Sequence, residues 1–248
     1  MGVGVSNGGS PVGRYDRRTF LAIALQMTAL CFTRSGEAMG DRSHPQGIRK
    51  LEGEVRINGV AGKIGDPVSP GDVVTTGPRS MAVFVVGRAV FLIREESRLE
   101  LTAERLDGDR DRGKAALKTL RLLNGKLLSV FGEGEEPTVE TPTLIAGVRG
   151  TGFYIEADPR RSYICTCYGT IEIIARKAPE HRQTVTAHHH EMARYVHAPG
   201  AEVIIEEAPM RNHTDAELIL LESMVGRKPP FVGDETVPHR KKRGRNGY

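Results

Sequence analysis

The stretch Thr141–Ile155, TPTLIAGVRGTGFYI, decides the fold of this 248-residue chain. A proline and a series of glycines interrupt any helical period in it. The valine, threonine, phenylalanine and isoleucine that lie between the glycines favour extended backbone. The stretch therefore predicts a turn between strands, or a single strand kinked by glycine.

A short unit recurs around this stretch, in which a glycine precedes a strand of alternating apolar residues. It occurs at Gly53–Ile57, Gly125–Val130 and Gly169–Ile173. Alternation with period two after a turn-forming glycine indicates a strand. Because the spacings between the units are unequal, they do not form a regular repeat array. The expected fold is all-β, an irregular, twisted, solenoid-like stack of short strands, with one short C-terminal helix.

The run VRGTGFYI at 148–155 resembles the core motif of the FecR domain, a periplasmic all-β module named after regulators of iron-siderophore uptake. The resemblance also covers PGDVVTTG at 70–77 and the apolar strands Met81–Val86 and Ala89–Ile93. It implies a β domain over residues 51–174. It also implies a non-enzymatic sensing, ligand-binding or scaffold module that acts in signalling in the bacterial envelope. The motif residues with an expected structural role are Arg149, Gly150, Thr151 and Phe153, and we expect the arginine to bond turn carbonyls.

The segments outside this domain divide by composition. Residues 39–50 are expected to be a linker, and residues 175–228 form a histidine-rich segment followed by a helix. Thr214 and Glu217 have the spacing of a capping box, and Gly226 supplies a stop after the apolar positions of that helix. The helix is expected to dock on the β domain. Residues 229–248 are expected to be a disordered basic tail.

Residues 1–38 are expected to be an export signal that directs the chain to the periplasm. Arg17 and Arg18 precede Phe20 and Leu21, and an apolar run follows that is too short for a permanent membrane span. The R-R-x-F-L spacing resembles a twin-arginine signal, whose machinery exports folded proteins. Ordinary secretion and an uncleaved anchor are the alternatives.

The net charge of +4 arises from basic residues near the two ends of the chain. Five cationic residues in the tail, at 240–243 and 245, exceed it alone. Basic residues elsewhere are interspersed with acidic ones, so a nucleic-acid partner is not expected. The expected partner is an envelope protein or a cell-wall polymer, with weak contact of the tail with a membrane surface.

Cys165 and Cys167 are separated by one residue in YICTCYGTIEI, at 163–173. If the backbone is extended, both thiols point to the same face of the strand. Six of the eight histidines follow within residues 181–213. Thiolate and imidazole together suit soft or borderline ions. The candidate ligands are Cys165, Cys167, His188, His189, His190 and His197, for a copper, zinc or iron ion or for haem.

Other interpretations of these residues remain open. The cysteines could fill the core, form a disulfide or act as redox-active thiols, and the histidines could belong to a polar loop. A metal- or haem-binding periplasmic protein is thus the alternative function. The chain lacks a nucleophile elbow, a P-loop and an H-E-x-x-H motif, so catalysis is not expected.

Overall fold

The computed structural model describes residues 1, 44–105, 115–201 and 204–233. These residues form an all-β body with one helix near its C-terminal end, so the expected fold class is confirmed. The elements are β1 (Gly47–Glu52), β2 (Val55–Ile57), β3 (Val60–Ala61), β4 (Val73–Thr76), β5 (Met81–Val86), β6 (Ala89–Ile93), β7 (Arg98–Arg105), β8 (Ala115–Val130), β9 (Thr138–Glu140), β10 (Leu144–Ala157), β11 (Arg161–Ala175), β12 (Arg182–Ala187), β13 (Met192–His197), β14 (Ile205–Ala208) and α2 (Asp215–Met224).

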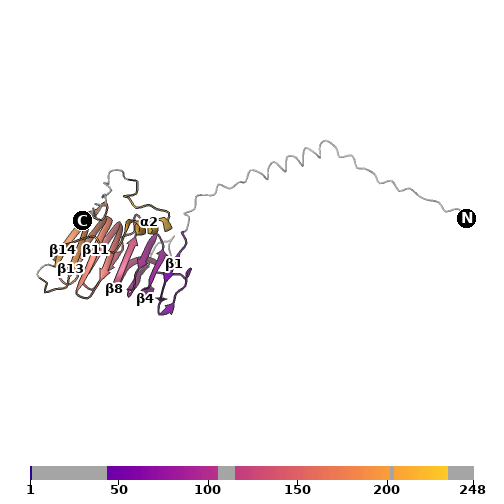
Figure 1. Cartoon of the computed structure of the whole chain (residues 1–248), viewed down its shortest axis with the longest axis horizontal. Coiled ribbons are helices and arrows are strands. Elements are labelled where there is room, and N and C mark those ends of the chain that lie inside the picture. The colour runs from indigo at the N-terminus through magenta and orange to yellow at the C-terminus, as the bar shows by residue number, and fades with distance from the viewer. Residues whose placement is uncertain (2–43, 106–114, 202–203, 234–248) are drawn as a thin grey trace, which may run out of the picture. The chain divides into compact units, whose positions relative to one another are not determined.

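Three long strands, β8, β10 and β11, each change partner along their length. The first half of β8 pairs with β7, and its last four residues pair with β6. The C-terminal half of β11 pairs with β12, whereas its N-terminal half pairs with β13. The strands run side by side from β14 through β11 and β8 to β4, as Figure 1 shows. The sheet thus branches at the long strands.

Apolar residues alternate between two cores on opposite faces of the strands. On β5, Phe84 belongs to the larger core, whereas Val83 and Val85 belong to a second core. Leu218 and Leu221 of α2 complete the second core, so the helix covers that face of the sheet. This arrangement explains why β5 and β6 are apolar at every position. The predicted docking of the helix on the β body is confirmed.

Two of the three recurring glycines have a role that differs from the expected one, whereas Gly53 precedes the short strand β2 as expected. Gly125 and Gly169 lie inside long strands, with φ of 96° and 86°, and do not precede short ones. Positive φ is a conformation that glycine adopts without steric cost. Gly150 has φ of 53° at an irregularity of β10, with open space around it. These three glycines therefore bend continuous strands. The stretch Thr141–Ile155 combines both expected forms, since residues 141–143 connect β9 to β10 and the rest lies in the glycine-kinked strand β10.

The sheet extends past both ends of the expected β domain. β1 begins at Gly47, inside the expected linker, and β12, β13 and β14 follow residue 174. Thr214 caps α2 together with Glu217, as the capping-box spacing predicts. Among the described residues, no helix has the length and apolar character needed to cross a membrane. The predicted export signal with Arg17, Arg18, Phe20 and Leu21 lies outside the described residues, as do residues 234–248 of the predicted tail. Residues 229–233 of that tail are described, and Phe231 packs against the second core, so this part is not the disordered tail that was expected.

Candidate metal centre

Cys165 lies on the half of β11 that pairs with β13, and Cys167 follows just after the last residue of that ladder; both are buried. Both side chains belong to the second core, whereas Ile164 belongs to the larger one. The prediction that the two thiols share a face is therefore correct. The cysteines are free, and no disulfide joins them.

His190 is held above the cysteines by its own backbone. It lies in the turn between β12 and β13, and its backbone N–H donates to the carbonyl of Cys167 at 2.9 Å. Its φ is 56°, in the left-handed region that side-chain-bearing residues rarely occupy. Such conformations cost about 1–3 kcal/mol and concentrate at functional sites. The turn thereby fixes the imidazole at 3.9 Å from the Cys165 sulfur, measured from Nδ1.

His213 reaches the same point from the segment that leads into α2. It is buried, and its ring stacks on Tyr154 at a centroid distance of 4.7 Å. Its Nδ1 donates to the carbonyl of Arg211 at 2.7 Å, and its Nε2 lies 3.0 Å from Nδ1 of His190. This histidine was not among the predicted ligands.

Four donor atoms converge in this way: two thiol sulfurs and two imidazole nitrogens. One ligand atom from each of Cys165, Cys167, His190 and His213 lies within 4.8 Å of every other. A tetrahedral zinc ion, with Zn–S of about 2.3 Å and Zn–N of about 2.0 Å, requires ligand atoms about 3.3–3.8 Å apart. The donors therefore need only small movements to enclose one ion. A porphyrin does not fit between atoms at this spacing.

His190 and His213 each make a hydrogen bond on the side of the ring away from the other histidine. These outer bonds determine which ring nitrogens face each other without a proton. Nε2 of His190 lies 2.8 Å from a carboxylate oxygen of Asp215, and Nδ1 of His213 faces a carbonyl. Both partners can only accept, so the outer nitrogens carry the protons of the neutral rings. The inner nitrogens then present two lone pairs to each other at 3.0 Å. Only a proton or a metal ion between these atoms relieves that repulsion.

The protonation of the cluster is shifted toward charged forms. The neighbouring Cys167 side chain, and then His190 and His213, lower the pKa of Cys165 to about 3. Burial opposes the charging of His190, but the thiol of Cys165 and the carboxylate of Asp215 outweigh it and raise the pKa of this histidine. Burial and the neighbouring Cys165 raise the pKa of Cys167. A thiolate at Cys165 and a positive charge at His190 therefore stabilise each other.

Three of the predicted histidine ligands lie outside this cluster. His189 bonds the same oxygen of Asp215 at 2.9 Å but does not join the cysteines, and the side chain of His188 is exposed. His197 pairs with Glu206 at 2.8 Å. His197 pairs with Arg161 in the ladder between β11 and β13. Arg161 precedes Cys165 by four residues, which is about 13 Å along a strand. The turn between β12 and β13 and the direction of the strands bring His190, and none of the other three predicted histidines, to the cysteines.

The predicted motif residues occupy the kink of β10. Thr151 and Phe153 are buried, and the ring of Phe153 stacks on Phe131 at 5.9 Å. Arg149 is exposed, and no hydrogen bond among the described residues joins its side chain to a turn carbonyl, contrary to the expectation. Arg149 lies at the register irregularity of β10, and it belongs to neither core.

Comparison with known proteins gives no family for this chain. No known protein family matches it, and no curated protein does. Two crystal structures of a proposed anti-sigma factor from Parabacteroides distasonis are similar to it in fold. The first has a TM-score of 0.45 at 12% identity and covers 59% of this chain and 64% of the neighbour. The second has a TM-score of 0.43 at 10% identity and covers 55% and 60%. The chain thus spans less than two thirds of the length of these neighbours.

Proposed function

We propose that this protein is a non-enzymatic metal-binding module that holds one divalent soft ion, of which Zn²⁺ fits best. The ligands are Cys165, Cys167, His190 and His213. The observation that carries the proposal is the convergence of four donors whose outer partners leave the inner lone pairs unprotonated. Metal-binding histidines usually donate their other ring N–H to a carboxylate or carbonyl, as Asp215 and the Arg211 carbonyl allow here.

The charge and the number of ligands favour zinc in a closed site. Two thiolates balance a divalent cation, which leaves the buried centre neutral, whereas a monovalent copper ion leaves a net negative charge. A set of two sulfurs and two nitrogens is typical of tetrahedral zinc. Catalytic zinc sites keep a position open for water, and four protein ligands fill the shell here. The closed shell supports a binding or sensing role and not catalysis.

The purified protein is expected to bind one equivalent of Zn²⁺, as measured by elemental analysis after gel filtration. The Cys165→Ser, Cys167→Ser double variant and the His213→Ala variant should each lose stoichiometric binding, because they remove ligands from a four-donor shell. His188→Ala is the matched control, since it removes an exposed imidazole from the same histidine run. Equal binding by all four proteins, or binding abolished by the control, contradicts the proposal.

We also propose that the module is a FecR-like domain that acts in the periplasm as a sensor or scaffold. The VRGTGFYI run and the all-β architecture support this part of the proposal. Its partner is then an envelope protein or a cell-wall polymer. An export machinery that accepts folded proteins would let the ion bind before the protein crosses the membrane.

Export is tested by replacing Arg17 and Arg18 with lysine. If the twin-arginine route is used, the precursor should accumulate in the cytoplasm, because that route reads the arginine pair and not its charge alone. Cell fractionation and immunoblotting measure the distribution. Unchanged export of the lysine variant contradicts the twin-arginine route, and an absence of the wild-type protein from the periplasm contradicts export.

A further inference from the structure

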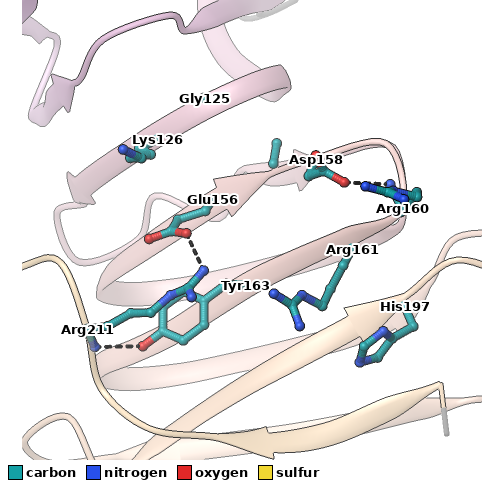
Figure 2. A pocket seen from close by; sticks show the side chains of 10 residues that line it. Gly125, Lys126, Glu156, Asp158, Arg160, Arg161, Tyr163, His197 and Arg211 are labelled. Carbon is teal, nitrogen blue, oxygen red and sulfur yellow. Dashed lines mark hydrogen bonds and ion pairs between the residues drawn. The ribbon is translucent and has the colours of Figure 1, made fainter. Parts of the chain in front are cut away.

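A cavity of about 490 Å³ opens at the N-terminal end of β11, where Arg161 and Tyr163 line it. Its walls come from the end of β10, the start of β11, the bend of β8 and the segment before α2. Cationic side chains predominate in its lining, as Figure 2 shows: Lys126, Arg160, Arg161 and Arg211. This size is in the range of small-molecule sites.

Two of these cations are already neutralised by acidic side chains. Lys126 pairs with Glu95 at 2.6 Å, and Arg211 pairs with Glu156. The imidazole of His197, which also lines the cavity, bonds Glu206. The charged and polar groups on this part of the cavity wall are therefore paired within the protein, and these pairs fix the position of the wall.

Arg160 and Arg161 are different, since among the described residues no carboxylate pairs with either guanidinium. Both are exposed, and Figure 2 shows the guanidinium of Arg161 extending into the space between Tyr163 and His197. Asp158 also lines the cavity, and its carboxylate accepts a hydrogen bond from the backbone N–H of Arg160 at 2.9 Å, so it partly offsets the charge there. The Arg161 guanidinium therefore faces the cavity with no carboxylate partner from the described part of the chain.

The guanidinium of Arg161 is held in a defined orientation. Its Cζ lies 4.2 Å from the centroid of the Tyr195 ring, and Arg211 lies 5.3 Å from the same centroid. The Tyr195 ring packs edge-on against buried Tyr163, so it is a fixed support. A guanidinium that stacks on a ring keeps its in-plane N–H donors available, and their fork matches two oxygens of a phosphate or a carboxylate.

We propose that this cavity is a binding site for a small organic anion that carries a phosphate or carboxylate group, with Arg161 as the group that binds the oxyanion. Arg160 adds charge at the mouth of the cavity. None of the residues that line the cavity is one of the four proposed metal ligands, and the proposal does not depend on bound metal. The volume admits an anion of about the size of a sugar phosphate.

Isothermal titration of the full protein with glucose 1-phosphate, glucuronate and glucose tests this site. Saturable one-to-one binding is expected for one or both of the anions, and none for glucose. A preference for the first or the second anion distinguishes phosphate from carboxylate. Arg161→Gln should weaken binding by about tenfold or more, because it removes a charge-assisted bidentate contact, and Arg161→Lys should restore it only in part.

Arg56→Gln is the matched control. Arg56 is also an exposed arginine on a strand, but it lies on β2 and pairs with Glu54 at 2.7 Å. Its substitution should leave the affinity unchanged. Three results overturn the proposal: no saturable binding of either anion, equal loss of affinity in the Arg56→Gln and Arg161→Gln variants, or wild-type affinity in the Arg161→Gln variant. Equal loss would indicate attraction by net charge alone.

Discussion

Loading the metal-free protein with Zn²⁺ should raise its melting temperature by about 8–16 °C. A ligand that binds only the native state stabilises it by about 4 kcal/mol when its free concentration is 1,000 times Kd. For a domain of this size, each kcal/mol corresponds to about 2–4 °C. The effect should be large because the ion joins three segments that are far apart in sequence: β11, the turn at His190 and the segment before α2. Differential scanning calorimetry measures the shift.

The Cys165→Ser, Cys167→Ser variant should show no zinc-dependent shift, and a chelator should reverse the shift in the wild type. His188→Ala, which keeps all four ligands, should respond as the wild type does. A wild-type melting temperature that does not change with zinc contradicts a site that bridges these segments. An equal shift in the cysteine variant places the binding elsewhere.

Gly125→Ala should destabilise the protein by about 2–6 kcal/mol. Gly125 has φ of 96°, and a Cβ at this position would lie 2.4 Å from the Cα of Ser97. Ser97 is buried, and its hydroxyl accepts a hydrogen bond from the backbone of Lys126, so it cannot move without loss of that bond. Backbone strain and overpacking each cost about 1–3 kcal/mol. Chemical denaturation measures the change in the free energy of unfolding.

Gly65→Ala separates the two causes. Gly65 has φ of 92°, close to that of Gly125, but has nothing within 4 Å of an added Cβ. Its substitution should cost only the conformational part, about 1–3 kcal/mol. If the two variants are equally stable, close packing at the bend of β8 is not what requires Gly125.

The fold was predictable where local pattern determines it. The apolar runs Met81–Val86 and Ala89–Ile93 are β5 and β6 with the expected bounds, and the capping box marks the start of α2. The pattern did not show that strands continue through Gly125 and Gly169. A glycine before an alternating run is compatible with a turn and with a bend, and only the choice of pairing partners distinguishes them.

The part of the candidate site that lies on a single strand was predictable from the sequence. Period-two geometry places Cys165 and Cys167 on the same face without any knowledge of the fold. The choice of His190 depends on its positive φ and its backbone bond to Cys167, which no spacing reveals. The role of His213 depends on where α2 docks. A histidine next to a predicted helix cap was the available signal, but its distance from the cysteines required tertiary structure.

X-ray absorption at the zinc edge of the one-equivalent complex tests the central claim most directly. The predicted first shell has two sulfurs at about 2.3 Å and two nitrogens at about 2.0–2.1 Å, with the outer-atom scattering of two imidazole rings. One sulfur should disappear from this shell in a Cys167→Ser variant that still retains zinc. A shell of only nitrogen and oxygen ligands in the wild-type protein would contradict the assignment of Cys165 and Cys167 as metal ligands.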